Sequence, residues 1–134
     1  MMKRKDMLLA LALCVLPALS AAATGSWVAS QSAALRVALS DRESRSAPLA
    51  PPANIAPGAR IKSVSWRFKL PPGEQISARL CHPQACIPAM GQRGYSEALA
   101  NLRADKPLEF RFRLQQTGRP VRVTGLQIIV NYHR

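Results

Sequence analysis

Two cysteines, Cys81 and Cys86, are the side chains best placed to do chemistry, and only His82-Pro83-Gln84-Ala85 separates them. Such a connection suits a tight hairpin, and cysteines opposite each other on neighbouring strands meet the Cα separation of under about 7 Å that a disulfide requires. The spacing therefore predicts a structural disulfide. Redox catalysis is an alternative, but dithiol oxidoreductases usually place two residues between their cysteines and use a helix N-terminus.

A metal site or a catalytic centre would need further ligands or acid–base groups, and the sequence supplies few of them. Zinc held by the two cysteines would need two more ligands, and only His82 and His133 are available. His82 is too close to both cysteines to complete a tetrahedron easily. There is no recognisable Ser, His and Asp cluster and no glycine-rich phosphate loop. We therefore predict no enzyme activity, no cofactor and no metal.

The basic residues are more informative. Six of them occupy the polar phase of alternating segments: Arg67, Lys69, Arg79, Arg111, Arg113 and Arg122. If those segments neighbour one another in one sheet, their side chains form an arginine-rich outer face for an anionic or acidic partner. Arginine favours such a role because its planar guanidinium pairs with carboxylate and phosphate through two hydrogen bonds. The alternative is scattered charge that only keeps the protein soluble.

The segments that position these residues have a hydrophobic period of two, typical of strands with one buried and one solvated face. The pattern covers residues 35–39, 64–70, 76–80, 108–114 and 121–132, and shorter strands are expected around Trp27 and after Cys86. In the last segment the apolar phase changes at Thr124-Gly125, which predicts a β-bulge. Six or seven short strands predict an all-β fold, a small antiparallel β-sandwich or barrel. Its expected core includes Trp66, Phe68, Phe110 and Phe112.

Proline and glycine clusters separate the predicted strands, as at Pro71-Pro72-Gly73 and residues 117–120. Residues 41–58 contain four prolines and form either a mobile loop or an extended crossover between two sheets. Residues 95–104 form either a short helix or a loop with an edge strand. The sequence contains no internal repeat and indicates a single domain.

The first 23 residues have the pattern of a cleaved signal peptide. Lys3-Arg4-Lys5 precede an apolar run at residues 7–19, and Ala21-Ala22-Ala23 supply the small residues that signal peptidase recognises. The run is shorter than the roughly 20 apolar residues of a membrane-spanning helix. Cys14 is not expected to carry a lipid, because bulky Leu13 precedes it where a lipoprotein signal has a small residue.

We therefore expect a mature periplasmic domain at residues 24–134, in a compartment that oxidises cysteines. Cleavage would remove three of the 19 basic residues and one of the seven acidic residues, leaving a net charge of +10. A charge of this size informs on partners, not on fold. Export removes nucleic acid as a partner, which leaves acidic proteins, anionic lipid headgroups and cell-wall polymers. Contact with a membrane surface stays open, but we predict no integral membrane segment.

A set of short segments recurs in order along this chain. They are Gly25-Ser26-Trp27-Val28-Ala29-Ser30, Ser46-Ala47-Pro48-Leu49, Val64-Ser65-Trp66-Arg67-Phe68, Arg79-Leu80-Cys81 answered by Cys86, Gly91-Gln92-Arg93-Gly94, Pro107-Leu108-Glu109-Phe110 and Ile129-Val130-Asn131-Tyr132. Through their order and spacing the chain resembles FlhE, a family of small periplasmic proteins associated with bacterial flagella. The family's cysteine pair maps onto Cys81 and Cys86.

The resemblance implies a non-enzymatic accessory factor of flagellar assembly that acts by protein–protein contact at the export apparatus. It would guard against proton leakage or act as a chaperone-like regulator, with flagellar export or rod proteins as partners. Residues 41–61 apart from 46–49, and the arginine excess, match the family less well. A second hypothesis is an envelope-binding module that docks on anionic lipid or cell-wall polymer through the same arginines.

Overall fold

The computed structural model describes residues 24–134; the predicted signal peptide at residues 1–23, including Cys14, lies outside this part. The described residues form strands and no helix, so they contain no helix that could cross a bilayer. The strands are β1 Thr24–Gln31, β2 Leu35–Val37, β3 Ser44–Arg45, β4 Arg60–Lys69, β5 Ile76–His82, β6 Ala85–Pro88, β7 Arg93–Ser96, β8 Glu109–Leu114 and β9 Val121–His133.

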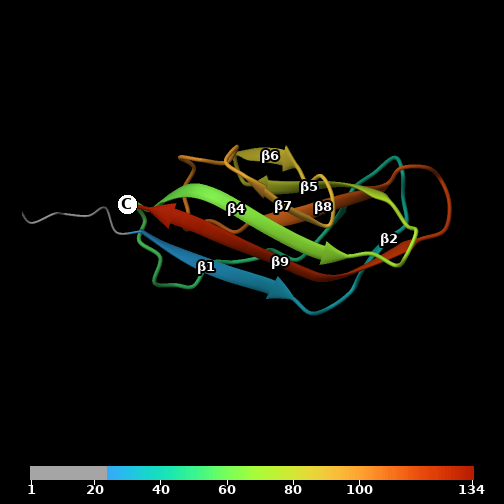
Figure 1. Cartoon of the computed structure of the whole chain (residues 1–134), viewed down its shortest axis with the longest axis horizontal. Coiled ribbons are helices and arrows are strands. Elements are labelled where there is room, and N and C mark those ends of the chain that lie inside the picture. The colour runs from blue at the N-terminus through green and yellow to red at the C-terminus, as the bar shows by residue number, and fades with distance from the viewer. Residues whose placement is uncertain (1–23) are drawn as a thin grey trace, which may run out of the picture.

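Two antiparallel sheets make up the architecture (Figure 1). The five-stranded sheet has the order β1-β9-β4-β7, and β2 pairs with the first residues of β9, beyond the end of β1. The four-stranded sheet has the order β3-β8-β5-β6. The predicted all-β sandwich class is confirmed. Residues 24–134 hold nine strands, more than the six or seven expected, because two very short ones, β3 and β7, carry no clear alternation.

The connection at residues 41–58 is a crossover between the sheets, since it leaves β2 in one sheet and forms β3 in the other. Backbone hydrogen bonds hold it against β8, and the Ser46 hydroxyl accepts a further bond from the Phe110 N–H at 2.9 Å. The other ambiguous stretch, residues 95–104, continues edge strand β7 and then runs through turns. It contains no helix.

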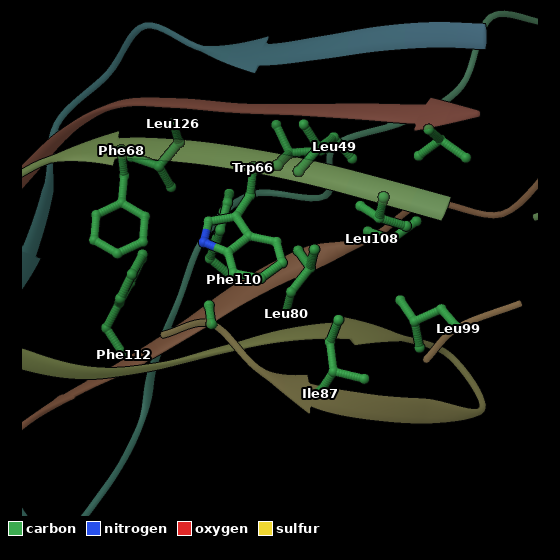
Figure 2. Packing of buried hydrophobic residues seen from close by; sticks show 14 of the residues in the cluster. Leu49, Trp66, Phe68, Leu80, Ile87, Leu99, Leu108, Phe110, Phe112 and Leu126 are labelled. Atoms are coloured by element: carbon green, nitrogen blue, oxygen red, sulfur yellow. The ribbon is translucent and has the colours of Figure 1, made fainter. Parts of the chain in front are cut away.

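The core lies between the two sheets, as Figure 2 shows for its larger side chains. Phe68 packs edge-on against Phe110 and Phe112, with ring centroids 5.7 and 5.2 Å apart. Aromatic rings prefer this edge-to-face geometry because the positive ring edge meets the negative ring face. Trp66 is also buried, so the predicted four-residue core is confirmed.

Strand β9 contains the predicted bulge. Arg67 of β4 lies opposite Gln127 and Lys69 lies opposite Thr124, so a single β4 residue faces two residues of β9. Gly125 has φ = 62°, a left-handed conformation that costs glycine little. The bulge keeps the apolar residues on both sides of the phase change directed into the core.

Edge strand β7 is fitted closely to Trp66. The Trp66 indole lies against Gly94 of β7, and its Nε1–H donates to the carbonyl of Gly91 at 3.2 Å. A Cβ at position 94 would overlap the indole ring. Trp66 therefore sets the height at which β7, with Arg93 and Tyr95, sits beside β4.

Candidate functional site

The structure divides the six predicted basic residues between two outer faces. Arg67 and Lys69 of β4 and Arg122 of β9 belong to the five-stranded sheet, whereas Arg79 of β5 and Arg111 and Arg113 of β8 belong to the four-stranded sheet. In a sandwich the outer faces of the two sheets point away from each other. The expectation of one shared basic face is therefore corrected to two groups of three residues.

On the four-stranded sheet, carboxylates pair with the arginines. Arg79 binds Glu43 through two hydrogen bonds of 2.7 Å, and Arg111 and Arg45 both contact Glu109, at 2.9 and 3.7 Å. The hydrogen bond from Arg79 lowers the pKa of Glu43 below its usual 4.5. This outer face is therefore largely neutralised by its own acids.

The five-stranded sheet has no such compensation. Its strands contain seven Lys and Arg residues and no Asp or Glu: Arg36, Arg60, Lys62, Arg67, Lys69, Arg93 and Arg122. None of these seven takes part in an ion pair within residues 24–134. Cations without nearby carboxylates leave an attractive field for an anionic partner.

Within this face the cations are grouped by strand pairing. Arg67 lies directly opposite Arg93 of β7, and Arg36 of β2 lies opposite Arg122 of β9. Like charges on directly opposed residues destabilise a sheet pair, so folding alone does not explain their position. We call the seven cations on this sheet the basic face.

Sequence reasoning missed two members of the basic face that matter here, Arg36 and Arg93. Arg36 had a visible signal, because it occupies the polar phase between Leu35 and Val37. Arg93 had none, since β7 is only four residues long and its inward position is Gly94 instead of an apolar residue. Neither could be assigned to a sheet from local pattern.

The Cys81–Cys86 disulfide is formed, and it joins directly opposed residues of the β5–β6 hairpin with Cα atoms 4.0 Å apart. The hairpin turn has two residues, Pro83 and Gln84, fewer than the four residues between the cysteines, because His82 and Ala85 are still paired. A staple across strands agrees with the structural role predicted for this pair.

His82 is buried beside the disulfide, and both its ring nitrogens have backbone partners. Nδ1 accepts from the Gln84 N–H at 3.1 Å, so Nε2 carries the proton and donates to the Arg103 carbonyl at 3.0 Å. Burial lowers the pKa of His82 below its usual 6.5. These contacts give His82 a structural task, fastening the hairpin to the segment that follows β7.

Other features of a chemical centre are sparse in the part of the chain described. Residues 24–134 contain no group of three or more His, Cys, Asp or Glu side chains that could hold a metal ion. A small hollow of about 190 Å³ beside the disulfide is lined mainly by Pro48, Pro83, Pro107 and Leu108 with Arg111. A larger one of about 440 Å³ opens on the five-stranded sheet.

Fold and surface together define a small, disulfide-bridged β-sandwich with one neutralised and one cationic outer sheet, a surface suited to contact with an anionic partner. The family model "Flagellar protein FlhE" matches residues 35–133. The chain belongs to the FlhE family of flagellar proteins, as its sequence motifs indicated, and a flagellar role follows from that membership.

Two individual proteins support the assignment. A flagellar protein FlhE from Yersinia enterocolitica is 38% identical over 130 residues, which cover 88% of this chain and 87% of the relative. A solved structure described as the crystal structure of FLHE superposes with a TM-score of 0.69 at 28% identity, covering 83% of this chain and 98% of that chain.

Proposed function

We propose that this protein is a non-enzymatic periplasmic accessory factor of flagellar assembly that acts by protein–protein contact at the export apparatus. It guards against proton leakage there or regulates assembly in the manner of a chaperone. Flagellar export or rod proteins are the expected partners. The observation that carries the contact hypothesis is the basic face, with seven cations and no ion pair within the described residues.

Several features favour contact over catalysis. His82, the histidine beside the disulfide, has both ring nitrogens occupied by backbone groups. Cys81 and Cys86 are bonded to each other across a strand pair, which keeps them from acting as a free nucleophile or a metal ligand. What the fold offers a partner is a broad sheet surface with fixed charge.

Periplasmic location is supported by the leader pattern at residues 1–23 and by the disulfide, because disulfides persist in oxidising compartments. A periplasmic protein cannot act on the cytoplasmic side of the export machinery. Its contact with that machinery would therefore be made at segments exposed outside the inner membrane.

Deletion of the gene tests the proposal. The deletion strain should differ from wild type in swarming, in the location of flagellin or in cytoplasmic pH during growth in acid, and plasmid expression of the full chain should restore the difference. A plasmid lacking residues 3–19 serves as the matched control, since the protein would then stay in the cytoplasm. A deletion strain equal to wild type in all three measurements would refute the flagellar proposal.

The envelope-binding alternative is separated by a second measurement. The full chain, purified from the periplasm, is mixed with vesicles of phosphatidylglycerol and with peptidoglycan fragments at low and high salt. Tight, salt-sensitive binding to either would favour docking on the envelope, because exposed charge interactions weaken as the Debye length shrinks.

A further inference from the structure

The basic face carries a second kind of surface that its charge does not explain. Val28, Ile129 and Tyr95 are 52%, 36% and 58% exposed, and they lie on three different strands of the five-stranded sheet. Strand register places them in one line: Val28 opposite Ile129, Ile129 opposite Ser65, and Ser65 opposite Tyr95. We call Val28, Ile129 and Tyr95 the apolar row.

The apolar row has a basic neighbour on one side. Two residues along each strand, Arg93 lies opposite Arg67, Arg67 opposite Gln127, and Gln127 opposite Ser30. Rows two residues apart are about 7 Å apart, within reach of one bound segment. A ligand on the apolar row would therefore place its flanking groups beside Arg67 and Arg93.

On its other side the apolar row borders a recess. Ser26 lies opposite Asn131, whose side-chain N–H donates to the hydroxyl of Ser63 at 3.0 Å. These short polar residues, with Lys62 and the side of Tyr95, line the hollow of about 440 Å³. The Tyr95 hydroxyl donates to Glu97 at 2.8 Å, which fixes the ring at the rim of the hollow.

The relief of this face distinguishes between partners. Val28 and Ile129 are short side chains, whereas Arg67, Lys69 and Arg93 stand on long stems, so a flat bilayer held at the guanidinium groups would not reach the apolar row. Interfacial binding requires apolar side chains that enter the acyl boundary. A narrow polypeptide segment can enter the row between the long cations and the recess.

We propose that the outer face of the five-stranded sheet binds an acidic, partly apolar segment of a partner protein. Apolar side chains of that segment pack on Val28, Ile129 and Tyr95, and its carboxylates pair with Arg67 and Arg93. The inference rests on the proposed function in that the partner is a protein, and it adds the chemistry of that partner and the residues that select it.

A binding experiment with defined probes tests the proposal on the full chain, purified after processing. The probe is a fluorescent peptide in which glutamates flank leucines, measured by anisotropy at low salt. A second peptide of equal charge has serine in place of leucine. We expect binding of the leucine peptide and about tenfold weaker binding of the serine peptide, since about 1.4 kcal/mol per tenfold is a small part of burying several leucines.

Variants then locate the site. Arg67→Gln with Arg93→Gln, and separately Val28→Ser with Ile129→Ser, should each weaken binding of the leucine peptide about tenfold. The matched control is Arg45→Gln with Arg113→Gln, which removes the same charge from the four-stranded sheet and should change affinity less than about twofold. Circular dichroism confirms that each variant is folded.

Four results would overturn the inference: no binding of the leucine peptide, equal binding of the serine peptide, equal loss in the control variant, or tighter binding to phosphatidylglycerol vesicles through the same residues. In cells, the same variants are expressed in the deletion strain. If the deletion has a phenotype that both face variants rescue fully, the inference fails and the proposed function stands. If the deletion has no phenotype, the proposed function fails and the peptide experiment still decides the surface.

Discussion

Replacing Gly94 by alanine is the sharpest test of how β7 is held. An added Cβ would overlap the Trp66 indole, which is buried between the sheets and cannot move without disturbing its neighbours. Either the indole shifts or β7 lifts away from β4. In both cases the 3.2 Å hydrogen bond from Trp66 Nε1 to the Gly91 carbonyl is distorted.

The expected size of the effect follows from three contributions. Overpacking of a closely fitted site costs about 1–3 kcal/mol, and the weakened hydrogen bond adds about 1 kcal/mol. Alanine restricts the unfolded chain more than glycine does, which offsets about 0.4–1 kcal/mol. We therefore expect Gly94→Ala to lower the free energy of unfolding by about 2 kcal/mol.

Urea unfolding followed by tryptophan fluorescence measures this change, and Trp66 itself reports on the displacement through its emission maximum. The matched control is Gly58→Ala, because a Cβ at Gly58 meets nothing within 4 Å. The control should lie within about 0.5 kcal/mol of wild type. Adding Trp66→Phe to Gly94→Ala should recover part of the loss, since contacting residues couple. A Gly94→Ala protein as stable as wild type, with unshifted emission, would refute the reasoning.

Two further predictions concern the β5–β6 hairpin. Replacing Cys81 and Cys86 together by serine should lower the free energy of unfolding in urea by about 2 kcal/mol, because the bridge closes a short loop; an equal stability of both forms would contradict a structural role. His82 has a lowered pKa, so the folded protein binds fewer protons than the unfolded chain as pH falls below 6.5, and stability should fall from pH 7.5 to pH 5.5 with a slope of at most about 1.4 kcal/mol per pH unit. The variant His82→Gln should show a smaller slope in the same urea titrations, and an unchanged slope would assign the effect to other groups.

Local pattern predicted most strands but not their neighbours. The alternation in β4, β5, β8 and β9 is visible because each buries one face, and the phase change marked Gly125 as a bulge. Sheet membership depends on pairing between distant segments, such as β1 with β9, which no short window encodes. This is why the six predicted cations were expected on one face and occupy two.

The binding surface was only partly visible for the same reason. Val28, Ile129 and Tyr95 come from segments far apart in sequence and form one row only through strand register. The missing acids of the five-stranded sheet become meaningful only once its strands are known. Composition gave the excess charge, and pairing gave its location.

The last strand has a consequence for the order of events during synthesis. β9 pairs with β1, β2 and β4, so the first strand to emerge from a ribosome or a translocation channel waits for the final residues before it gains a neighbour. Thr24 and Arg60 both lie opposite His133, next to the C-terminal residue. Because long-range pairing of this kind is slow to form, the chain stays extended until its end is released, the state in which a secretory channel can pass it.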